Sequence, residues 1–310
     1  MRLAIEFGGT NFKLGLFNHS GDSIKLNSIP LQLLTSEKNI LKAIISSVKT
    51  FLGSEKIVSG GISSKGLVDH HKGMVLDDVG EGKLIENIPL RDIFSDEFSV
   101  PFIMDNDARC YAWGEWKFSK DKDINNLTVI TFGTGIGCAS VFNGKMLYGS
   151  DHLGGVMGGH ISINRNGPKC ECGNYGCFEL YCSKPALLDE IGSYKNIDDL
   201  DDDSVKEFFH DVRENNNKTQ NEIFERFIEN ISQGVTNIIH AYSPDMVVLG
   251  GGIMKSADLM LEKITESINE MAFTLPRGRI KIVQSKLGDT APLLGAAFHP
   301  SLEKDHEYYI

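Results

Sequence analysis

The sequence lacks the long apolar segments of a membrane or secreted protein. It contains no run of about 18 apolar residues, the length that a membrane-spanning helix needs. The first twelve residues, MRLAIEFGGTNF, carry one basic residue and reach glycines after a short apolar stretch. That pattern is typical of a buried strand and not of a signal peptide. We therefore expect a cytoplasmic location and no membrane partner.

An excess of positive charge is also missing. The 310 residues include 42 Asp and Glu against 31 Lys and Arg, which gives a formal net charge of −11. A broad nucleic-acid-binding surface needs the opposite balance, so we expect no nucleic-acid partner. With 41% hydrophobic and 24% charged residues, the composition is that of a globular chain long enough for two lobes with separate cores.

The glycine patterns of two common nucleotide-binding folds are absent as well. No segment fits the Walker pattern G-x-x-x-x-G-K-[ST], and the glycines at 133–137 have the wrong spacing for the Rossmann pattern and run into a strand. Three glycine turns nevertheless follow apolar strands: Gly8-Gly9-Thr10, Gly133-Thr134-Gly135 and Gly250-Gly251-Gly252. Glycine lets backbone N–H groups approach an anion, although each turn alone is better explained by steric need. The three together favour a bound nucleotide.

Apolar runs and helical spacing predict a chain of alternating strands and helices. Strands are predicted over residues 3–7, 12–17, 57–62, 102–104, 127–132, 138–142 and 246–249, an extended segment over 24–31, and helices over 40–48, 109–117, 224–241 and 259–271. A strand, a glycine turn and a second strand follow one another in two places, and Asn143-Gly144 predicts a hairpin turn. Polar connections are expected over 198–203 and 215–217, and Pro300 is expected to stop the last helix.

Asp105-Asn106-Asp107 directly follows one of the predicted strands. Phosphoryl transfer to an alcohol needs a carboxylate near the attacking hydroxyl, and a neighbouring amide can orient a polyol. Aspartate and asparagine also favour helix N-caps and turns, and this alternative explains the segment equally well.

Three of the six cysteines, Cys170, Cys172 and Cys177, crowd into a Cys-x-Cys-Gly-x-x-Gly-Cys knuckle. Without a secretory signal, this spacing indicates metal ligation and not a disulfide framework, and tetrahedral zinc needs a fourth ligand. His160, which follows two glycines, is the best candidate, and His152 is the competitor. The alternative is three unrelated buried thiols, and Cys110, Cys138 and Cys182 are expected to be packed in this way.

Seven segments together carry a resemblance to a known family: IEFGGTNFKLGLF, GISSKGLVD, DNDARCYAWGE, FGTGIGCASVFNGKMLYGS, GGHISINRNGPKCECGNYGCFE, VVLGGG and LGDTAPLLGAA. From Leu3 to about Ala297 the chain resembles the ROK family of sugar kinases and repressors, in the hexokinase–actin-like superfamily. The zinc knuckle with its preceding Gly-His is the most specific of these segments. The family's repressors carry an additional N-terminal helix-turn-helix domain, and here the nucleotide-binding strand begins at residue 3, which favours a kinase.

The resemblance implies a two-lobed, actin-like (ribonuclease H-like) α/β fold with mixed sheets flanked by helices and a zinc knuckle. We place the smaller lobe at residues 1–117 plus about 295–310, and the larger lobe with the zinc loop at 118–294. The two lobes are expected to close over ATP and Mg²⁺ and so to exclude water as an acceptor. Family members are often dimers, so a homodimer is one expected assembly.

Site residues are implied wherever this sequence matches the family's motifs. Asp107 is expected to be the general base acting on a hydroxyl of a hexose, with Asn106, Glu179, His160 and the backbone of Gly66 as sugar ligands. The zinc would be structural and held by His160, Cys170, Cys172 and Cys177. The residues implied in binding ATP and Mg²⁺ are Glu6, Gly8, Gly9, Thr10, Asn11, Gly133, Thr134, Gly135, Gly250, Gly251 and Gly252.

Two positions depart from the family pattern. Glu6 stands where members usually have Asp, and Met157 stands where a second sugar-binding Glu is usual, three residues before the Gly-His histidine. These departures sustain a second reading, a catalytically weak or inactive sugar-binding regulator, which the intact Asp107 opposes. A zinc-dependent hydrolase is a poorer fit, because one His and three Cys form a closed site, whereas catalytic zinc keeps an open position.

Overall fold

The computed structural model describes residues 1–35, 39–77, 84–119, 121, 123–149, 153, 156–195, 200, 203–214 and 217–303. Two compact units make up the chain: unit 1 comprises residues 1–125, 139–156 and 286–310, and unit 2 comprises 126–138 and 157–285. The predicted lobes, with a boundary between residues 117 and 118, differ from these units in their bounds and stay a prediction. Among the described residues, no helix combines the length and the apolar character needed to cross a membrane.

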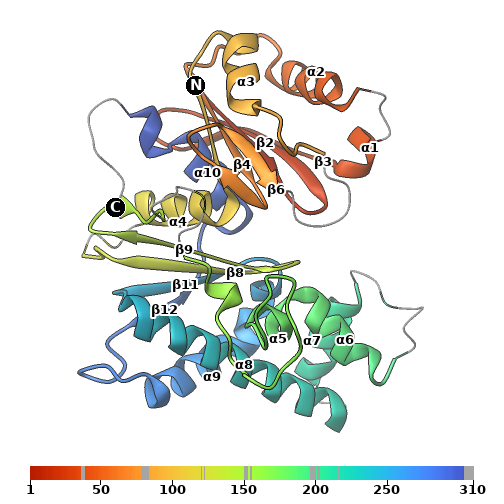
Figure 1. The fold of residues 1–310 in the computed structure, drawn as a ribbon, viewed down its shortest axis with the longest axis vertical. Coiled ribbons are helices and arrows are strands. Elements are labelled where there is room, and N and C mark those ends of the chain that lie inside the picture. Colours follow the sequence, from red (N-terminus) through yellow and green to blue (C-terminus); the bar gives the residue numbers. More distant parts are fainter. Residues whose placement is uncertain are drawn as a thin grey trace. The chain divides into compact units, whose positions relative to one another are not determined.

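Unit 1 is built on a five-stranded sheet of order β3-β2-β1-β4-β7 (Figure 1). Its strands are β1 (Arg2–Phe7), β2 (Asn11–Phe17), β3 (Ser23–Pro30), β4 (Ser59–Ser64) and β7 (Phe102–Asn106). Strand β1 is antiparallel to β2 and parallel to β4, and β4 is parallel to β7. The parallel strands therefore end at one edge, which carries the Asp105–Asp107 segment. A two-stranded sheet of β5 (Leu67–Asp69) and β6 (Met74–Asp77) follows β4.

Helices cover both faces of this sheet. They are α1 (Leu31–Thr35), α2 (Ile40–Leu52), α3 (Leu90–Phe98), α4 (Asp107–Lys117) and α10 (Ala291–Ala297). The alternation of strand side chains separates two cores. Leu3 and Ile5 of β1 pack with Ile44 of α2 and with α3, whereas Ala4 faces the other way and packs with Leu293 of α10.

Unit 2 contains most of the second sheet, whose order is β10-β9-β8-β11-β12. Its strands are β8 (Leu127–Phe132), β9 (Ile136–Phe142), β10 (Lys145–Met146), β11 (Met246–Gly250) and β12 (Lys281–Gln284). The helices of unit 2 are α5 (Glu179–Cys182), α6 (Lys184–Gly192), α7 (Ser204–Glu214), α8 (Lys218–Tyr242) and α9 (Ala257–Met271). Helix α8 buries one apolar stripe that includes Ile223, Phe227 and Ile231.

Most predicted elements are confirmed, and the differences lie at their ends. Helix α8 begins at Lys218, six residues before the prediction, because Asn217 caps it by accepting from Thr219 N at 2.9 Å. Strand β4 covers Ser59–Ser64 and not 57–62, since its pairing with β1 begins at Ser59, opposite Arg2. The predicted hairpin turn is confirmed, with positive φ at Asn143 and Gly144. Helix α10 ends at Ala297, before Pro300. Most of the predicted polar connections, 198–203 and 215–217, lies outside the described residues.

Candidate functional site

Asn106 occupies the N-cap of α4 and holds the carboxylate beside it. Its Oδ1 accepts from the backbone N–H groups of Ala108 at 3.0 Å and Arg109 at 3.3 Å. Its Nδ2 donates to the carbonyl of Gly66 at 3.1 Å and to Asp107 Oδ1 at 3.0 Å. The N-cap alternative is therefore confirmed, and the same side chain brings Gly66 and Asp107 together.

Asp107 begins α4 and is partly buried. Oδ1 also accepts from the N–H of Ala108 at 2.8 Å, which leaves Oδ2 as the oxygen available to a ligand. Surrounding protein atoms raise the pKa of Asp107 by desolvation, while the Ala108 hydrogen bond and the charge of Arg109 act in the opposite direction. A carboxylate with a raised pKa is a stronger base than an ordinary aspartate.

Glu6 lies opposite Lys13 in the β1–β2 register, and the two side chains pair. Lys13 Nζ lies 3.1 Å from Glu6 Oε1 and 3.3 Å from Oε2. Burial raises the pKa of Glu6 to about 7, against the effect of Lys13, and the charges of Asp107 and Asp289 raise it further. Two other carboxylates of unit 1, those of Asp107 and Asp289, are thus close enough to act on Glu6. Sequence reasoning missed Lys13, which the hairpin register could have supplied, and Asp289, which is distant along the chain.

The turn between β1 and β2 presents exposed polar atoms. Gly9 and Thr10 are exposed, and Gly8 N donates to Asn11 O at 3.0 Å. Asn11 Nδ2 donates to Thr10 Oγ1 at 3.0 Å, which orients the hydroxyl. This turn fits the predicted contact with an anion, and that role remains a prediction.

The turn between β8 and β9 is occupied in part by Glu179. The N–H of Ile136 donates to Glu179 Oε2 at 2.8 Å. A Cβ added to Gly135 would lie 2.5 Å from the same oxygen, so glycine is required here for the approach of a carboxylate of the protein itself. The sequence indicated an anion-binding turn but not that Glu179, 43 residues further along, reaches it.

The third glycine turn follows β11, and packing alone explains why its middle residue is glycine. Gly251 has φ of 88°, and a Cβ there would collide with the backbone of Phe132 at the end of β8. A Cβ on Gly252 would meet nothing within 4 Å, so this position is open. Gly250 ends β11. The steric alternative therefore accounts for Gly251, and the predicted contact of this turn with ATP stays a prediction.

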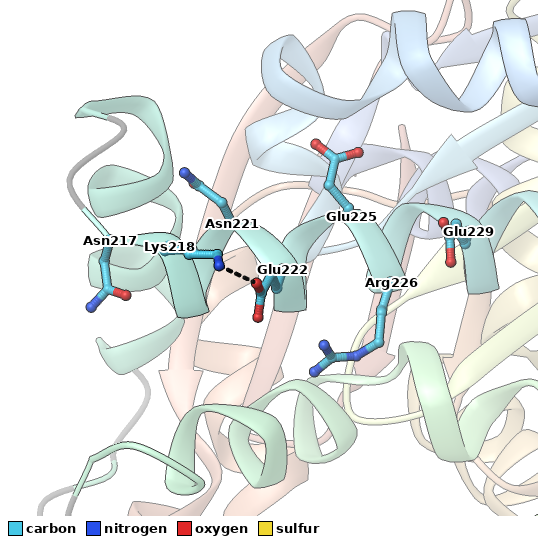
Figure 2. Close-up of a pocket in the computed structure, with 7 residues that line it drawn as sticks. All are labelled: Asn217, Lys218, Asn221, Glu222, Glu225, Arg226 and Glu229. Atoms are coloured by element: carbon cyan, nitrogen blue, oxygen red, sulfur yellow. Dashed lines mark ion pairs between the residues drawn. The ribbon is translucent and has the colours of Figure 1, made fainter.

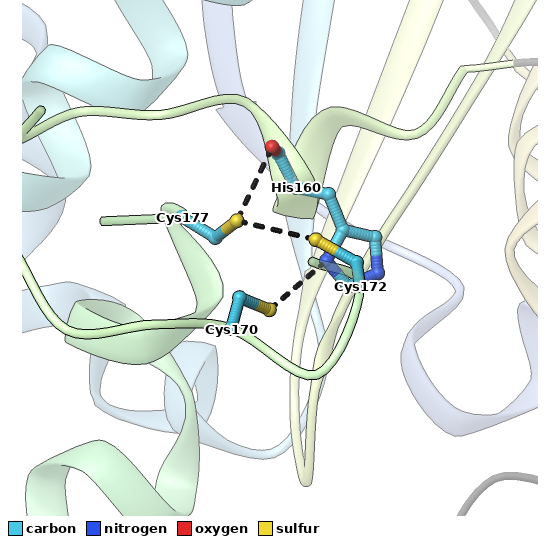
Figure 3. Close-up of side chains that lie close together, drawn as sticks. All are labelled: His160, Cys170, Cys172 and Cys177. Carbon is cyan, nitrogen blue, oxygen red and sulfur yellow. Dashed lines mark hydrogen bonds between the residues drawn. The ribbon is translucent and has the colours of Figure 1, made fainter. Parts of the chain in front are cut away.

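The four predicted metal ligands converge on one point in unit 2 (Figure 3). One ligand atom from each of His160, Cys170, Cys172 and Cys177 lies within 4.8 Å of the other three. Cys170 Sγ is 3.7 Å from His160 Nδ1, and the sulfurs of Cys172 and Cys177 are 3.6 Å apart. Tetrahedral zinc with bonds of about 2.0–2.3 Å holds its ligand atoms roughly 3.5–3.8 Å apart, so the spacing and the donor set both fit a zinc ion.

The backbone of the knuckle positions these ligands without the metal. Gly173 and Gly176 have φ of 93° and 61°, and the carbonyl of Asn164 leaves no room for a side chain on Gly176. A hydrogen bond of 2.9 Å from Phe178 N to Ile161 O ties the segment after Cys177 to the residue after His160. Glu179 follows directly, so one loop carries both the metal ligands and the predicted sugar ligand. The competing ligand His152 lies outside the described residues.

A groove of about 580 Å³ elsewhere on unit 2 has a different character (Figure 2). It is lined by residues of α8 and its N-cap, namely Asn217, Lys218, Asn221, Glu222, Glu225, Arg226 and Glu229. Lys218 pairs with Glu222, and Arg226 with Glu190. Exposed charges that neutralise one another on a helix surface are a poor substrate site, and none of the predicted site residues lines this groove.

Comparison with known proteins assigns the family. Residues 2–300 match the model of the ROK family. The chain is 26% identical over 305 residues to a glucokinase from Thermotoga maritima, with 95% of each chain covered. It is 28% identical over 310 residues to a xylose repressor from Caldicellulosiruptor bescii, with 94% of this chain and 76% of the repressor covered.

Among solved structures, a ROK family glucokinase from Streptomyces griseus in complex with glucose and AMPPNP shares the fold with a TM-score of 0.79. The identity is 22%, and the match covers 96% of this chain and 97% of that chain. The predicted α/β fold class with two mixed sheets is confirmed. Because the family model matches almost the whole chain, this protein belongs to the ROK family.

Proposed function

We propose that this protein is an ATP-dependent sugar kinase that transfers the γ-phosphate of ATP to a hydroxyl of a hexose or hexose derivative. The observation that carries the proposal is the Asp107 carboxylate, which Asn106 holds at the start of α4 and whose pKa is raised. A purely sugar-sensing protein has no need of a base at this point. The family assignment and the glucokinase relatives support the same activity.

In this proposal, the unit 1 residues orient the acceptor and take its proton. The Oδ2 atom of Asp107 accepts the proton of the attacking hydroxyl, while Oδ1 stays bonded to Asn106. The turn around Thr10 binds phosphate oxygens through backbone N–H groups and the hydroxyl. Carboxylate oxygens suit Mg²⁺, and in this proposal Glu6 would hold the ion after giving up its ion pair with Lys13. Bound Mg²⁺ supplies charge neutralisation to the transferring phosphoryl group.

In this proposal, residues of unit 2 bind the sugar, and the zinc knuckle holds them in place. Glu179 accepts hydrogen bonds from sugar hydroxyls, with its second oxygen fixed by Ile136 N. His160 uses Nδ1 toward the cysteines, which leaves Nε2 for the sugar. A zinc ion held by His160 and the three cysteines has a structural role, because four protein ligands leave no position for a reacting water.

A coupled assay of ADP release over a panel of hexoses tests the proposal. We expect ADP release that depends on the presence of glucose, mannose or an N-acetylated relative. The second candidate, a weakly active or inactive sugar-binding regulator, is favoured by the xylose repressor relative and by Met157. Calorimetric binding of a sugar, xylose included, with no ADP release from any member of the panel would establish the regulator and contradict the kinase.

Met157→Glu should improve the use of unmodified hexoses. Met157 is 53% exposed, just before the short helix that carries His160, so a carboxylate fits there without a cavity or a clash. A hydrogen bond from a hydroxyl to a carboxylate contributes roughly 1.5–3 kcal/mol, which is about a 10- to 100-fold lower Michaelis constant. The measurement is the Michaelis constant for glucose, mannose and their N-acetylated forms.

Met271→Glu is the matched control, because it adds the same charge at an exposed methionine at the end of α9. A parent that already has a low Michaelis constant for glucose, together with a poorer Met157→Glu variant, would show that position 157 is not a missing sugar ligand. In that case a neighbouring group has taken over the contact, and His152 is the candidate.

Gly135→Ala should weaken sugar binding more than ATP binding. The added Cβ would meet Glu179 Oε2, and a carboxylate at the end of a flexible chain can move aside at little cost in stability. Glu179 then loses its hydrogen bond from Ile136 N, which we expect to raise the Michaelis constant for the hexose roughly 10-fold. The measurement is the Michaelis constant for the hexose and, separately, the Michaelis constant for ATP.

Gly133→Ala is the control within the same turn, because its Cβ would come no closer than 4.0 Å to any atom and does not reach Glu179. We expect the hexose constant of this variant to match the parent. If Gly135→Ala instead raised the Michaelis constant for ATP and left that for the hexose unchanged, Gly135 would belong to the nucleotide-binding site.

A further inference from the structure

Four groups of unit 1 converge on the buried carboxylate of Asp105. Oδ1 accepts from Arg109 Nε at 2.6 Å and from the backbone N–H of Asn106 at 2.7 Å. Oδ2 accepts from the Tyr148 hydroxyl at 2.5 Å and lies 3.1 Å from His299 Nε2. Asp105 is fully buried, so both of its oxygens depend on these protein partners.

The protons of this network can be assigned from its geometry. His299 Nδ1 accepts from the N–H of Ser301 at 3.3 Å, so Nε2 carries the ring proton and donates to Asp105. Burial raises the pKa of Asp105, but Arg109 and these hydrogen bonds outweigh it and hold the pKa well below its usual range. Asp105 is therefore an ionised acceptor of four hydrogen bonds.

Arg109 connects this carboxylate to other segments of unit 1. Its terminal nitrogens donate to the carbonyls of Leu153 and Val68, each at 3.3 Å. The guanidinium also lies over the ring of Tyr148, 5.0 Å from the ring centre. The network thus ties distant segments to the start of α4. His299, for example, lies 194 positions after Asp105 in the chain.

The network is not a metal site, although His70, Asp105 and His299 lie close enough to share an ion. Asp105 already pairs with the guanidinium cation of Arg109, which opposes a second cation. His70 donates from Nδ1 to the Met104 carbonyl at 2.9 Å, and its Nε2 lies 3.2 Å from the Ser301 hydroxyl, so both ring nitrogens already have protein partners.

Its location suggests a task beyond stability. A buried ion pair adds little net stability compared with apolar packing, so the fold alone does not require one here. Asp105 and Arg109 lie two residues before and two residues after Asp107. The carboxylate of Asp105 fixes the N–H of Asn106, and Asn106 in turn fixes Asp107.

We propose that Arg109 and Tyr148 are positioning residues of the Asn106–Asp107 pair, acting through the carboxylate of Asp105. This inference rests on the proposed kinase function, in which a displacement of about 1 Å at the base costs about 100-fold in rate. Neither residue is assigned a contact with the acceptor. Both orient the first turn of α4.

Kinetics of three variants test the proposal. Tyr148→Phe removes one hydrogen bond to Asp105 and keeps the aromatic ring, and we expect kcat to fall about 10-fold, with both Michaelis constants within about threefold of the parent. The kcat of Arg109→Met should fall about 100-fold. The kcat of Arg109→Lys should lie between those of the other two variants, because lysine keeps the charge but lacks the planar guanidinium group that donates to several acceptors at once.

Amide hydrogen exchange gives a readout that does not depend on turnover. We expect exchange at residues 106–109 to become about 10-fold faster in Tyr148→Phe. Trp113→Phe is the matched control, since it removes a buried hydrogen bond of 2.7 Å between α4 and the Phe298 carbonyl without touching Asp105. This control should keep the parent kcat and the parent exchange at 106–109.

The outcomes separate the two proposals. Faster exchange at 106–109 in Tyr148→Phe but not in Trp113→Phe supports the network, even if the parent phosphorylates no hexose and the kinase proposal fails. Unchanged kcat and unchanged exchange in Tyr148→Phe, or equal changes in Trp113→Phe, would overturn the positioning role.

Discussion

Replacing Asp107 by asparagine should lower kcat by roughly 10²–10⁴, the usual contribution of general acid–base catalysis. Asparagine has nearly the same shape, and its side-chain carbonyl can still accept the hydrogen bonds from Asn106 and from Ala108 N. The first turn of α4 and the sugar ligands should therefore be preserved. The measurement is single-turnover and steady-state phosphorylation of the best hexose, together with calorimetric sugar binding.

Asp92→Asn provides the matched control. Asp92 is also an aspartate in the first turn of a helix of unit 1, and its side chain is exposed beside Arg91. The control should keep the parent kcat. Near-normal turnover in a folded Asp107→Asn protein would remove Asp107 from the role of base and would leave the kinase proposal without its central residue.

Loss of the metal should lower both stability and activity. Elemental analysis should find one zinc per chain, and Cys172→Ala should lose it. Cys172 is exposed, so its truncation leaves no buried cavity, and a fall in melting temperature reports the metal itself. A structural zinc site contributes up to about 10–16 kcal/mol in small peptides. Here a loss of about 3 kcal/mol would lower the melting temperature by roughly 6–12 °C.

Activity should fall with the zinc, because the same loop carries His160 and Glu179. We expect hexose turnover to drop at least 10-fold, because loss of a group that merely supports a metal ligand already costs about 10- to 100-fold and here a ligand itself is removed. Cys182→Ala is the control, a buried cysteine outside the cluster, and it should keep a full zinc content. Metal-free protein with full turnover and an unchanged melting temperature would refute the assignment.

Local sequence signals were sufficient for the parts of the site that depend on local structure. The apolar runs on either side of Gly8 and of Gly133 predicted two strand–turn–strand units, and both are present as β1–β2 and β8–β9. The Cys-x-Cys-Gly-x-x-Gly-Cys spacing predicted the convergence of Cys170, Cys172 and Cys177, because two glycines with positive φ reverse the chain within eight residues.

Contacts that depend on tertiary packing were not accessible in the same way. The spacing of Asp105 and Arg109 at i and i+4 could have suggested their ion pair. Nothing in the local pattern indicated that Tyr148 and His299 complete it, since they reach it from distant segments. The bond from Ile136 N to Glu179 was hidden for the same reason. Helix α8 was predicted too short because its polar first turn resembles the connection before it.

The packing of α10 against β1 has a consequence for how the chain folds during its synthesis. Ala4 is buried with Leu293 and Ala297 of α10, so this face of the first strand is not fully covered until almost 290 further residues have been added. At translation rates of about 5–20 residues per second, that interval is roughly 15–60 s. All residues of unit 2 are synthesised within it, since they end at Ser285. The first strand to be made is therefore among the last to be fully enclosed, and a chaperone has its longest opportunity to bind there.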